Sequence, residues 1–189
     1  FVEVMRSYVL DRDAVALRDE LGSGASDVAR IVSEVRERLE VESSAPGEPE
    51  EDRYRLLQAV TSFLRKAASV QHLLIVLEDL HDADRGTLEM LTHVARNLGG
   101  TRLMIVGTYR DVEVDRLHPL SGALAELRRV TSFDRVRLRG LTADEVQRMM
   151  AGIAGRDVAW GISEAVHRQT EGNPLFVQEV LRDLVEEGF

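Results

Sequence analysis

Two adjacent carboxylates follow a short run of apolar residues. The string LLIVLEDLHDAD covers residues 73–84, and Glu78 and Asp79 come directly after its five apolar residues. A continuous apolar run of this length is typical of a buried parallel strand. In open α/β sheets, ligands bind at the carboxyl ends of such strands. Carboxylates at that position hold Mg²⁺ and polarise a water for attack on a phosphate. The alternative is an exposed acidic turn after a core strand.

A second apolar run leads to an arginine. The string IVGTYRD covers residues 105–111 and places Arg110 just after a predicted strand. An arginine at a strand end can reach the γ-phosphate of a nucleotide and respond to its loss. The alternative is a surface arginine that pairs with Asp111 or Asp79.

A third string, TEGNPLFVQEVL, covers residues 170–181. Gly172 and Asn173 permit a tight turn, and Pro174 suits the first turn of the helix that follows. A rigid turn that carries a proline can pack against an adenine ring. The alternative is an ordinary joint between two helices, which Gly-Asn-Pro forms without any ligand.

The elements that must position these side chains begin with helices. Apolar residues at helical spacing predict helices over residues 1–42, broken at Gly22 and Gly24. An acidic, proline-containing loop is expected over residues 43–52, followed by a helix from about 52 to 70.

Strands then alternate with helices, which predicts an α/β fold with a mainly parallel sheet. The expected strands are residues 73–77, 102–109 and 134–138, and the expected helices are 85–98 and 119–130. Asp84 is predicted to cap the first of these helices.

After Gly140 the pattern is entirely helical. Thr142 and Glu145 form the capping-box signature T-x-x-E. Helices are expected over residues 142–153, 157–170 and from Pro174 to about Glu187, with Trp160 in their core. The predicted divisions are a helical segment at 1–70, an α/β core at 71–140 and a helical appendage at 141–189.

Composition narrows the class of protein. The chain has 189 residues, 24 basic against 33 acidic side chains and a net charge of −9. This balance disfavours direct nucleic-acid binding by this segment, which needs a basic face. With no cysteine, disulfides and cysteine-based zinc sites are excluded. No apolar run is long enough for a membrane span and no secretory signal is present, so a cytoplasmic protein is expected.

Taken together, the three strings resemble P-loop ATPase modules of the signal-transduction (STAND, AAA-like) type. Such modules occur in large bacterial LuxR-type regulators related to the maltose regulator, and in some cyclase-linked proteins. The family commonly shows a strand running into DDLHWAD, then GTYRD, an HPL segment and GNPLF. This chain has LEDLHDAD, GTYRD, HPL at residues 118–120 and GNPLF. The resemblance covers residues 70–189, and residues 1–70 are similar to the family's variable helical insertion.

The resemblance implies a partial P-loop NTPase sheet with flanking helices, followed by a small helical lid. It assigns Walker B positions, for catalysis and for Mg²⁺, to Glu78 and Asp79, and a sensor position to Arg110. Gly172, Asn173 and Pro174 take the Gly-x-Pro position against adenine.

The neighbouring residues of the first string receive structural roles. Asp84 is a helix cap, and His81 is a contact within the turn or switch. Three close residues on one turn rarely converge on a metal without further ligands. A metal site formed by His81, Asp82 and Asp84 is therefore disfavoured.

The chain departs from the family pattern in three ways. Glu78 stands where aspartate is frequent, and Asp82 where tryptophan is frequent. No G-x-x-x-x-G-K-[ST] motif occurs, and the Gly22-Ser23-Gly24 stretch lacks its lysine. Without that backbone cradle for phosphate, the chain alone is expected to bind ATP weakly or not at all and to be inactive. A missing first strand would leave a gap in the sheet, which self-association or a substitute element could fill.

Two functions remain open at this stage. One is a nucleotide-driven switch that uses ATP and Mg²⁺ in the intact parent protein. Its output would lie in other domains, such as a DNA-binding or cyclase domain. The other is a degenerate ATPase fold that serves as a protein-interaction scaffold without hydrolysis.

Overall fold

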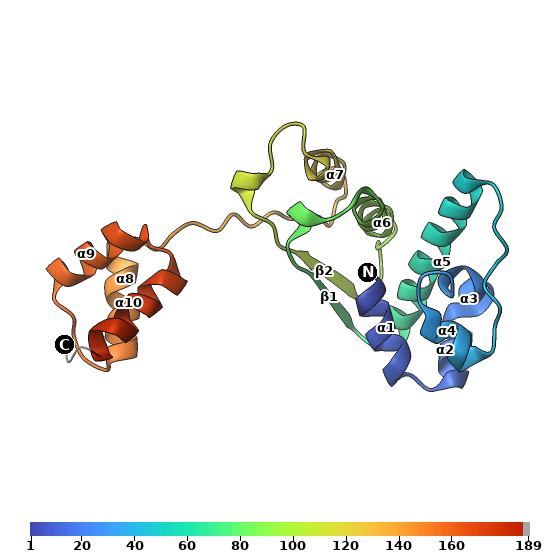
Figure 1. Ribbon diagram of the computed structural model, residues 1–189, viewed down its shortest axis with the longest axis horizontal. Helices are drawn as coiled ribbons and strands as arrows, with labels where there is room; N and C mark the ends of the chain where they lie inside the picture. Colours follow the sequence, from blue (N-terminus) through green and yellow to red (C-terminus); the bar gives the residue numbers. More distant parts are fainter. Residues whose placement is uncertain (187–189) are drawn as a thin grey trace. The chain divides into compact units, whose positions relative to one another are not determined.

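The structure is a computed structural model that describes the backbone of residues 1–186 and the side chains through Leu184 (Figure 1). The chain forms two compact units, Phe1–Asp134 and Arg135–Phe189. Each unit has its own hydrophobic core. None of the helices within the described part of the chain is both long and apolar enough to cross a membrane.

The first unit begins with short helices packed against one long helix. These are α1 (Val2–Asp11), α2 (Ala14–Leu21), α3 (Ala25–Val28), α4 (Ser33–Leu39) and the long α5 (Pro49–Val70). The predicted break at Gly22 and Gly24 is confirmed, because both glycines lie in the 3₁₀ turn between α2 and α3. An additional break comes at Asp13, whose carboxylate accepts the N–H groups of Val15 and Ala16 and so starts a new helix.

Helix α5 begins three residues before the predicted position. Pro49 occupies its first position, where a missing N–H costs nothing. The acids Glu50, Glu51 and Asp52 lie in its first turn, where they face the positive end of the helix dipole. The acidic stretch predicted as a loop therefore supplies the start of the helix.

The sheet has two parallel strands, β1 (Leu73–Leu77) and β2 (Leu103–Gly107), paired in register from Leu73 opposite Leu103. Helix α6 (Arg85–Arg96) lies between them in sequence. The predicted parallel pairing is confirmed, and so is the Asp84 cap, which accepts the Thr87 N–H at 2.8 Å.

Burial of β1 alternates from one residue to the next, so the prediction of a continuously buried strand is wrong. Ile75 and Leu77 are 3% and 8% exposed, whereas Leu74 and Val76 are 63% and 48% exposed. On β2, Met104 is also largely exposed. Strands covered on a single face bury every second side chain, and here the core lies on one face only.

The predicted third strand at residues 134–138 is also wrong. Helix α7 (Pro119–Leu127) is present, but residues 133–142 form no helix or strand. Val136 and Leu138 are exposed. Two alternating apolar residues flanked by arginines satisfy the strand pattern, but they offer little apolar area to hold a third strand against the sheet.

The second unit consists of α8 (Ala143–Ala154), α9 (Trp160–Thr170) and α10 (Pro174–Glu186). Its core is formed by one buried set of residues: Val146, Met150, Val166, Val177 and Leu181. The Thr142–Glu145 capping box is confirmed. Trp160 is half exposed at the start of α9, so its predicted place in the core is wrong. The predicted last helical residue, Glu187, lies outside the described residues.

Candidate functional site

The loops that follow β1 and β2 are joined by hydrogen bonds beyond the ends of the strands. The Thr108 N–H donates to Leu77 O at 2.9 Å, and the Leu80 N–H donates to Thr108 O at 2.8 Å. The Asp79 N–H donates to the Thr108 hydroxyl at 3.2 Å. These bonds fix the residues after one strand relative to those after the other, as a site at the carboxyl edge of a sheet requires.

Asp79 has a left-handed backbone, with φ 52° and ψ 48°. Aspartate is one of the few residues other than glycine that adopts this conformation readily. The conformation turns the chain from β1 into a 3₁₀ turn, Leu80–Asp82, which the buried Leu80 anchors. The Asp79 side chain is 65% exposed and Glu78 is exposed as well. Both predicted Walker B carboxylates are therefore accessible to solvent and ions.

His81 is the buried centre of this edge, with a side chain 4% exposed. Its Nδ1 accepts the backbone N–H of Arg110 at 3.4 Å. Its Nε2 lies 3.4 Å from Glu113 Oε2 and 3.9 Å from carboxylate oxygens of Asp79 and Asp82. One imidazole thus connects the loop after β1 with the loop after β2.

Arg110 lies in the same cluster. Its guanidinium donates to Glu113 Oε1 at 2.9 Å, and its side chain is 68% exposed. The pKa of Arg110 is raised, chiefly by the hydrogen bond to Glu113 and further by the charges of Asp79 and Asp82. The structure therefore brings Asp79 and Arg110 into one electrostatic neighbourhood. The carboxylate that Arg110 contacts belongs to Glu113, which the sequence did not single out.

The imidazole also determines what kind of cation this edge suits. Potential ligand atoms of His81, Asp82 and Glu113 lie within 4.8 Å of one another. Because Nδ1 accepts the Arg110 N–H, the proton of the neutral ring belongs on Nε2. The ring then presents a donor to the carboxylates, with no lone pair for a metal. Oxygen ligands remain, and these suit a hard ion such as Mg²⁺. The exposed carboxylates of Glu78 and Asp79 offer oxygen ligands of this kind.

In the second unit, the turn that contains Gly172 is held by backbone contacts. The Leu141 N–H donates to Gly172 O at 2.7 Å. Glu171 and Gly172 are left-handed, with φ 52° and 74°. A Cβ on Gly172 would lie 2.0 Å from Leu141 O, and one on Gly140 would lie 2.3 Å from Glu171 O. Both glycines are therefore required by the close approach of the two segments.

The predicted adenine contact lies at this turn. Asn173 Oδ1 accepts the Leu175 N–H at 3.0 Å and so caps α10, while Pro174 is exposed at the first position of the helix. A pocket of about 510 Å³ opens here within the second unit. Asn173, Pro174, Arg139 and the half-exposed ring of Phe176 line it. Phe176 was not predicted as a site residue, although it ends the GNPLF string.

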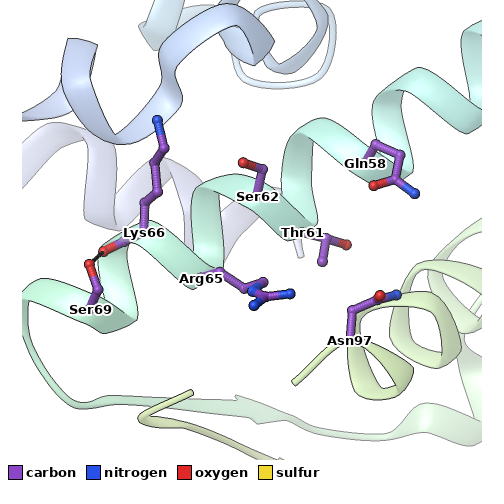
Figure 2. A pocket seen from close by; sticks show the side chains of 7 residues that line it. All are labelled: Gln58, Thr61, Ser62, Arg65, Lys66, Ser69 and Asn97. Carbon is purple, nitrogen blue, oxygen red and sulfur yellow. Dashed lines mark hydrogen bonds between the residues drawn. The ribbon is translucent and has the colours of Figure 1, made fainter. Parts of the chain in front are cut away.

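A further pocket lies along α5 and is unrelated to the predicted site residues (Figure 2). Its volume is about 390 Å³, and its lining is polar: Gln58, Thr61, Ser62, Arg65, Lys66, Ser69 and Asn97. Several of these donors already have partners, since Lys66 donates to Asp19 O and Ser69 to Lys66 O. The polar lining is thus partly engaged in contacts within the first unit.

Comparison with known proteins identifies the domain. The family model for the AAA ATPase domain matches residues 5–106, which include the N-terminal helices from Met5 onward, β1, the loop of Glu78 and Asp79, and β2 up to Val106. Searches of curated proteins and of solved structures found no match. The family match spans more than half of the 189 residues, and the chain therefore belongs to the AAA ATPase domain family.

Proposed function

We propose that the chain is part of a nucleotide-dependent switch ATPase of the signal-transduction (STAND) type. Membership of the AAA ATPase domain family supports an ATPase-type function. One observation carries the proposal further: Asp79 and Arg110 follow adjacent parallel strands, and the charge of Asp79 acts on Arg110. A metal-binding acid and a phosphate-sensing cation in one cluster are what a nucleotide switch requires.

The strand-end cluster binds metal and phosphate in this proposal. Asp79 presents exposed carboxylate oxygens to Mg²⁺, and Glu78 beside it orients water and accepts its proton. When bound, Mg²⁺ supplies positive charge that neutralises the phosphate oxygens. Arg110 pairs with the terminal phosphate, because its exposed guanidinium projects from the same edge.

The second unit supplies the contact to the base. Pro174 and Phe176 offer apolar surface in the pocket beside the Gly-Asn-Pro turn, and Gly172 keeps that turn rigid. In this proposal residues 141–189 act as a helical lid, residues 71–140 as the ATPase core and residues 1–70 as a helical insertion. The parent is a cytoplasmic regulator of the LuxR type, whose output lies in its other domains.

A degenerate scaffold is the second candidate, and one observation favours it. One face of the sheet exposes Leu74, Val76 and Met104, which is the kind of apolar surface that protein contacts cover. In this function the ATPase fold is kept for contacts with other domains or with a second copy of the chain.

The test is a calorimetric titration of Mg-ATP into this chain and into a longer product of the same gene, where the gene encodes residues ahead of Phe1. The switch predicts weak or absent binding by the short chain and clear binding by a product that carries a phosphate loop. In that product, Asp79→Ala and Arg110→Ala should each weaken binding or turnover about tenfold or more, since each removes a charged contact.

Arg96→Ala is the matched control. Arg96 is an exposed arginine paired with Glu126 on the same unit, away from the strand ends. Its removal should leave nucleotide affinity unchanged. If no form of the protein binds Mg-ATP, the switch proposal is wrong and the scaffold takes its place.

A further inference from the structure

The carboxylate of Glu113 is shared between two partners. Its Oε1 accepts from the Arg110 guanidinium at 2.9 Å, and its Oε2 lies 3.4 Å from His81 Nε2. Arg110 directly precedes the 3₁₀ turn Asp111–Glu113, which Glu113 ends, whereas His81 belongs to the loop after β1. The pair Arg110–Glu113 is therefore tied to a residue about thirty positions earlier in the chain.

The second partner matters because an exposed ion pair alone is a loose contact. Two long side chains at three-residue spacing gain little free energy in water and move readily. Arg110 and Glu113 are 68% and 43% exposed, whereas His81 is 4% exposed. A buried ring cannot follow their motion. Its Nδ1 accepts the Arg110 N–H, so the proton of the neutral ring belongs on Nε2, which lies 3.4 Å from Glu113 Oε2.

We propose that Glu113 is the resting counter-ion of Arg110 and that His81 is the positioning residue that holds Glu113 in place. A phosphoryl group that approaches Arg110 must then displace Glu113. The phosphate part of this inference rests on the proposed function, whereas the holding contact does not. Asp79 and Asp82 are the other charged groups near the ring. Both belong to the loop after β1, which also carries His81. Their carboxylates remain available to a metal ion while Glu113 is paired with Arg110.

The need to displace Glu113 sets a minimum charge for an anion that binds Arg110. Arg110 already has a carboxylate partner in the absence of ligand, so a singly charged anion gains nothing by replacing it. A phosphoryl group brings more negative charge and several acceptor oxygens, and it can therefore replace the carboxylate. Glu113 returns when the phosphate leaves, which resets the arginine without any other rearrangement.

Two substitutions of His81 separate this role from simple packing. In His81→Asn, the amide oxygen lies near the position of Nδ1 and can accept the Arg110 N–H, but it leaves Glu113 without a donor. In His81→Gln, the amide nitrogen reaches the position of Nε2 and keeps the donor to Glu113. A purely structural role predicts that the two variants behave alike.

The first experiment uses nuclear magnetic resonance on the whole chain without nucleotide. The ring nitrogens of His81 should show an unprotonated Nδ1 and a protonated Nε2. The Arg110 side chain should be ordered in the unsubstituted chain and in His81→Gln, as its N–H signal would show. In Glu113→Gln and His81→Asn the side chain should be mobile, and its N–H signal should be averaged by that motion. An unchanged Arg110 signal in Glu113→Gln, or identical behaviour of the two His81 variants, overturns the holding contact.

The second experiment titrates Mg-pyrophosphate, a phosphoryl probe without a base, into the longer product that carries a phosphate loop and into the same substitutions made in that product. There Glu113→Gln should bind it about two- to fivefold more tightly than the unsubstituted product, which matches the small free energy of an exposed ion pair. Glu3→Gln is the matched control, because Glu3 pairs with Arg6 at the same spacing on α1. Equal affinities, or no binding by any variant, overturn the competition. The resonance experiment still decides the holding contact, so failure of the proposed function is recognised separately.

Discussion

The strand-end cluster and the Gly-Asn-Pro turn are built in opposite ways. In the cluster, side chains from two loops meet, and buried His81 joins exposed Arg110 and Glu113. In the turn, backbone meets backbone, with Leu141 bonded to Gly172 and no room for a Cβ. The cluster can exchange partners at low cost because its ion pairs are exposed. The turn cannot, because any added atom must move the chain itself.

This difference separates what each region contributes. The cluster is suited to an exchange of ligands, since Arg110 can pair with one anion and then another while the fold stays intact. The turn is suited to a fixed contact, since it presents Pro174 from a rigid backbone. Substitutions should therefore affect stability strongly at the turn and weakly at the cluster.

The largest effect is expected for Gly172→Ala. The new Cβ would lie 2.0 Å from Leu141 O at a residue whose φ is +74°. The combined strain and overlap should lower the unfolding free energy of the second unit by about 3 kcal/mol. Trp160 is the only tryptophan in the chain and lies in this unit, so its fluorescence during urea unfolding reports the change.

Gly152→Ala supplies the matched control for this prediction. Gly152 lies within α8, and a Cβ there would meet nothing within 4 Å. Alanine should stabilise the helix by up to about 1 kcal/mol. Equal effects of the two substitutions would show that the turn is not the rigid element described above.

A smaller effect is expected for Glu145→Gln, and it depends on pH. Hydrogen bonds from Arg139, and then from the Thr142 N–H and hydroxyl, lower the pKa of Glu145 from 4.5 to about 2. A lowered pKa in the folded state stabilises the protein above pH 4.5, and this contribution is lost as the pH falls from 4.5 through about 2.

Glutamine keeps part of the capping box but cannot titrate. The unfolding temperature of the second unit should therefore vary less between pH 5 and pH 2.5 in Glu145→Gln than in the parent chain, as Trp160 fluorescence would show. If the unfolding temperature changed equally with pH in both proteins, the Glu145 contacts could not be the cause of that change.

The smallest effect on stability is expected for Asp79→Asn. Asparagine accepts the left-handed backbone of this position, and the substitution removes one of several neighbouring negative charges. The unfolding free energy should change by less than about 0.5 kcal/mol, as urea unfolding followed by circular dichroism would show. A loss of 2 kcal/mol or more would mean that the cluster is as rigid as the turn, and the comparison would fail.

Local signals in the sequence predicted local structure well. The strand at residues 73–77, the Asp84 cap and the Thr142–Glu145 capping box all depend on neighbouring residues, and each is confirmed. The family resemblance also pointed to the AAA ATPase domain, and the match at residues 5–106 shows that this domain includes the N-terminal helices.

Features that depend on distant partners were not predictable in this way. Val136 and Leu138 alternate as a strand does, but no strand in the described part of the chain pairs with them. The exposure of Leu74 and Val76 depends on which elements cover the sheet, and their own spacing does not reveal it. The sequence does not reveal Glu113 as a site residue, because a 3₁₀ turn brings it to Arg110 and a contact between two loops brings it to His81. The roles of the site residues stay predictions.

The hydrogen bond between Leu141 and Gly172 also has a mechanical meaning. Residues 133–142 carry no helix or strand, and a pull along this stretch reaches the first helix of the second unit just after residue 141. There the pull divides between the start of α8 and the Gly172 carbonyl, which lies next to the start of α10. A pulling force on the chain would thus act on α8 and α10 at the same time, and the three helices of the second unit would move together.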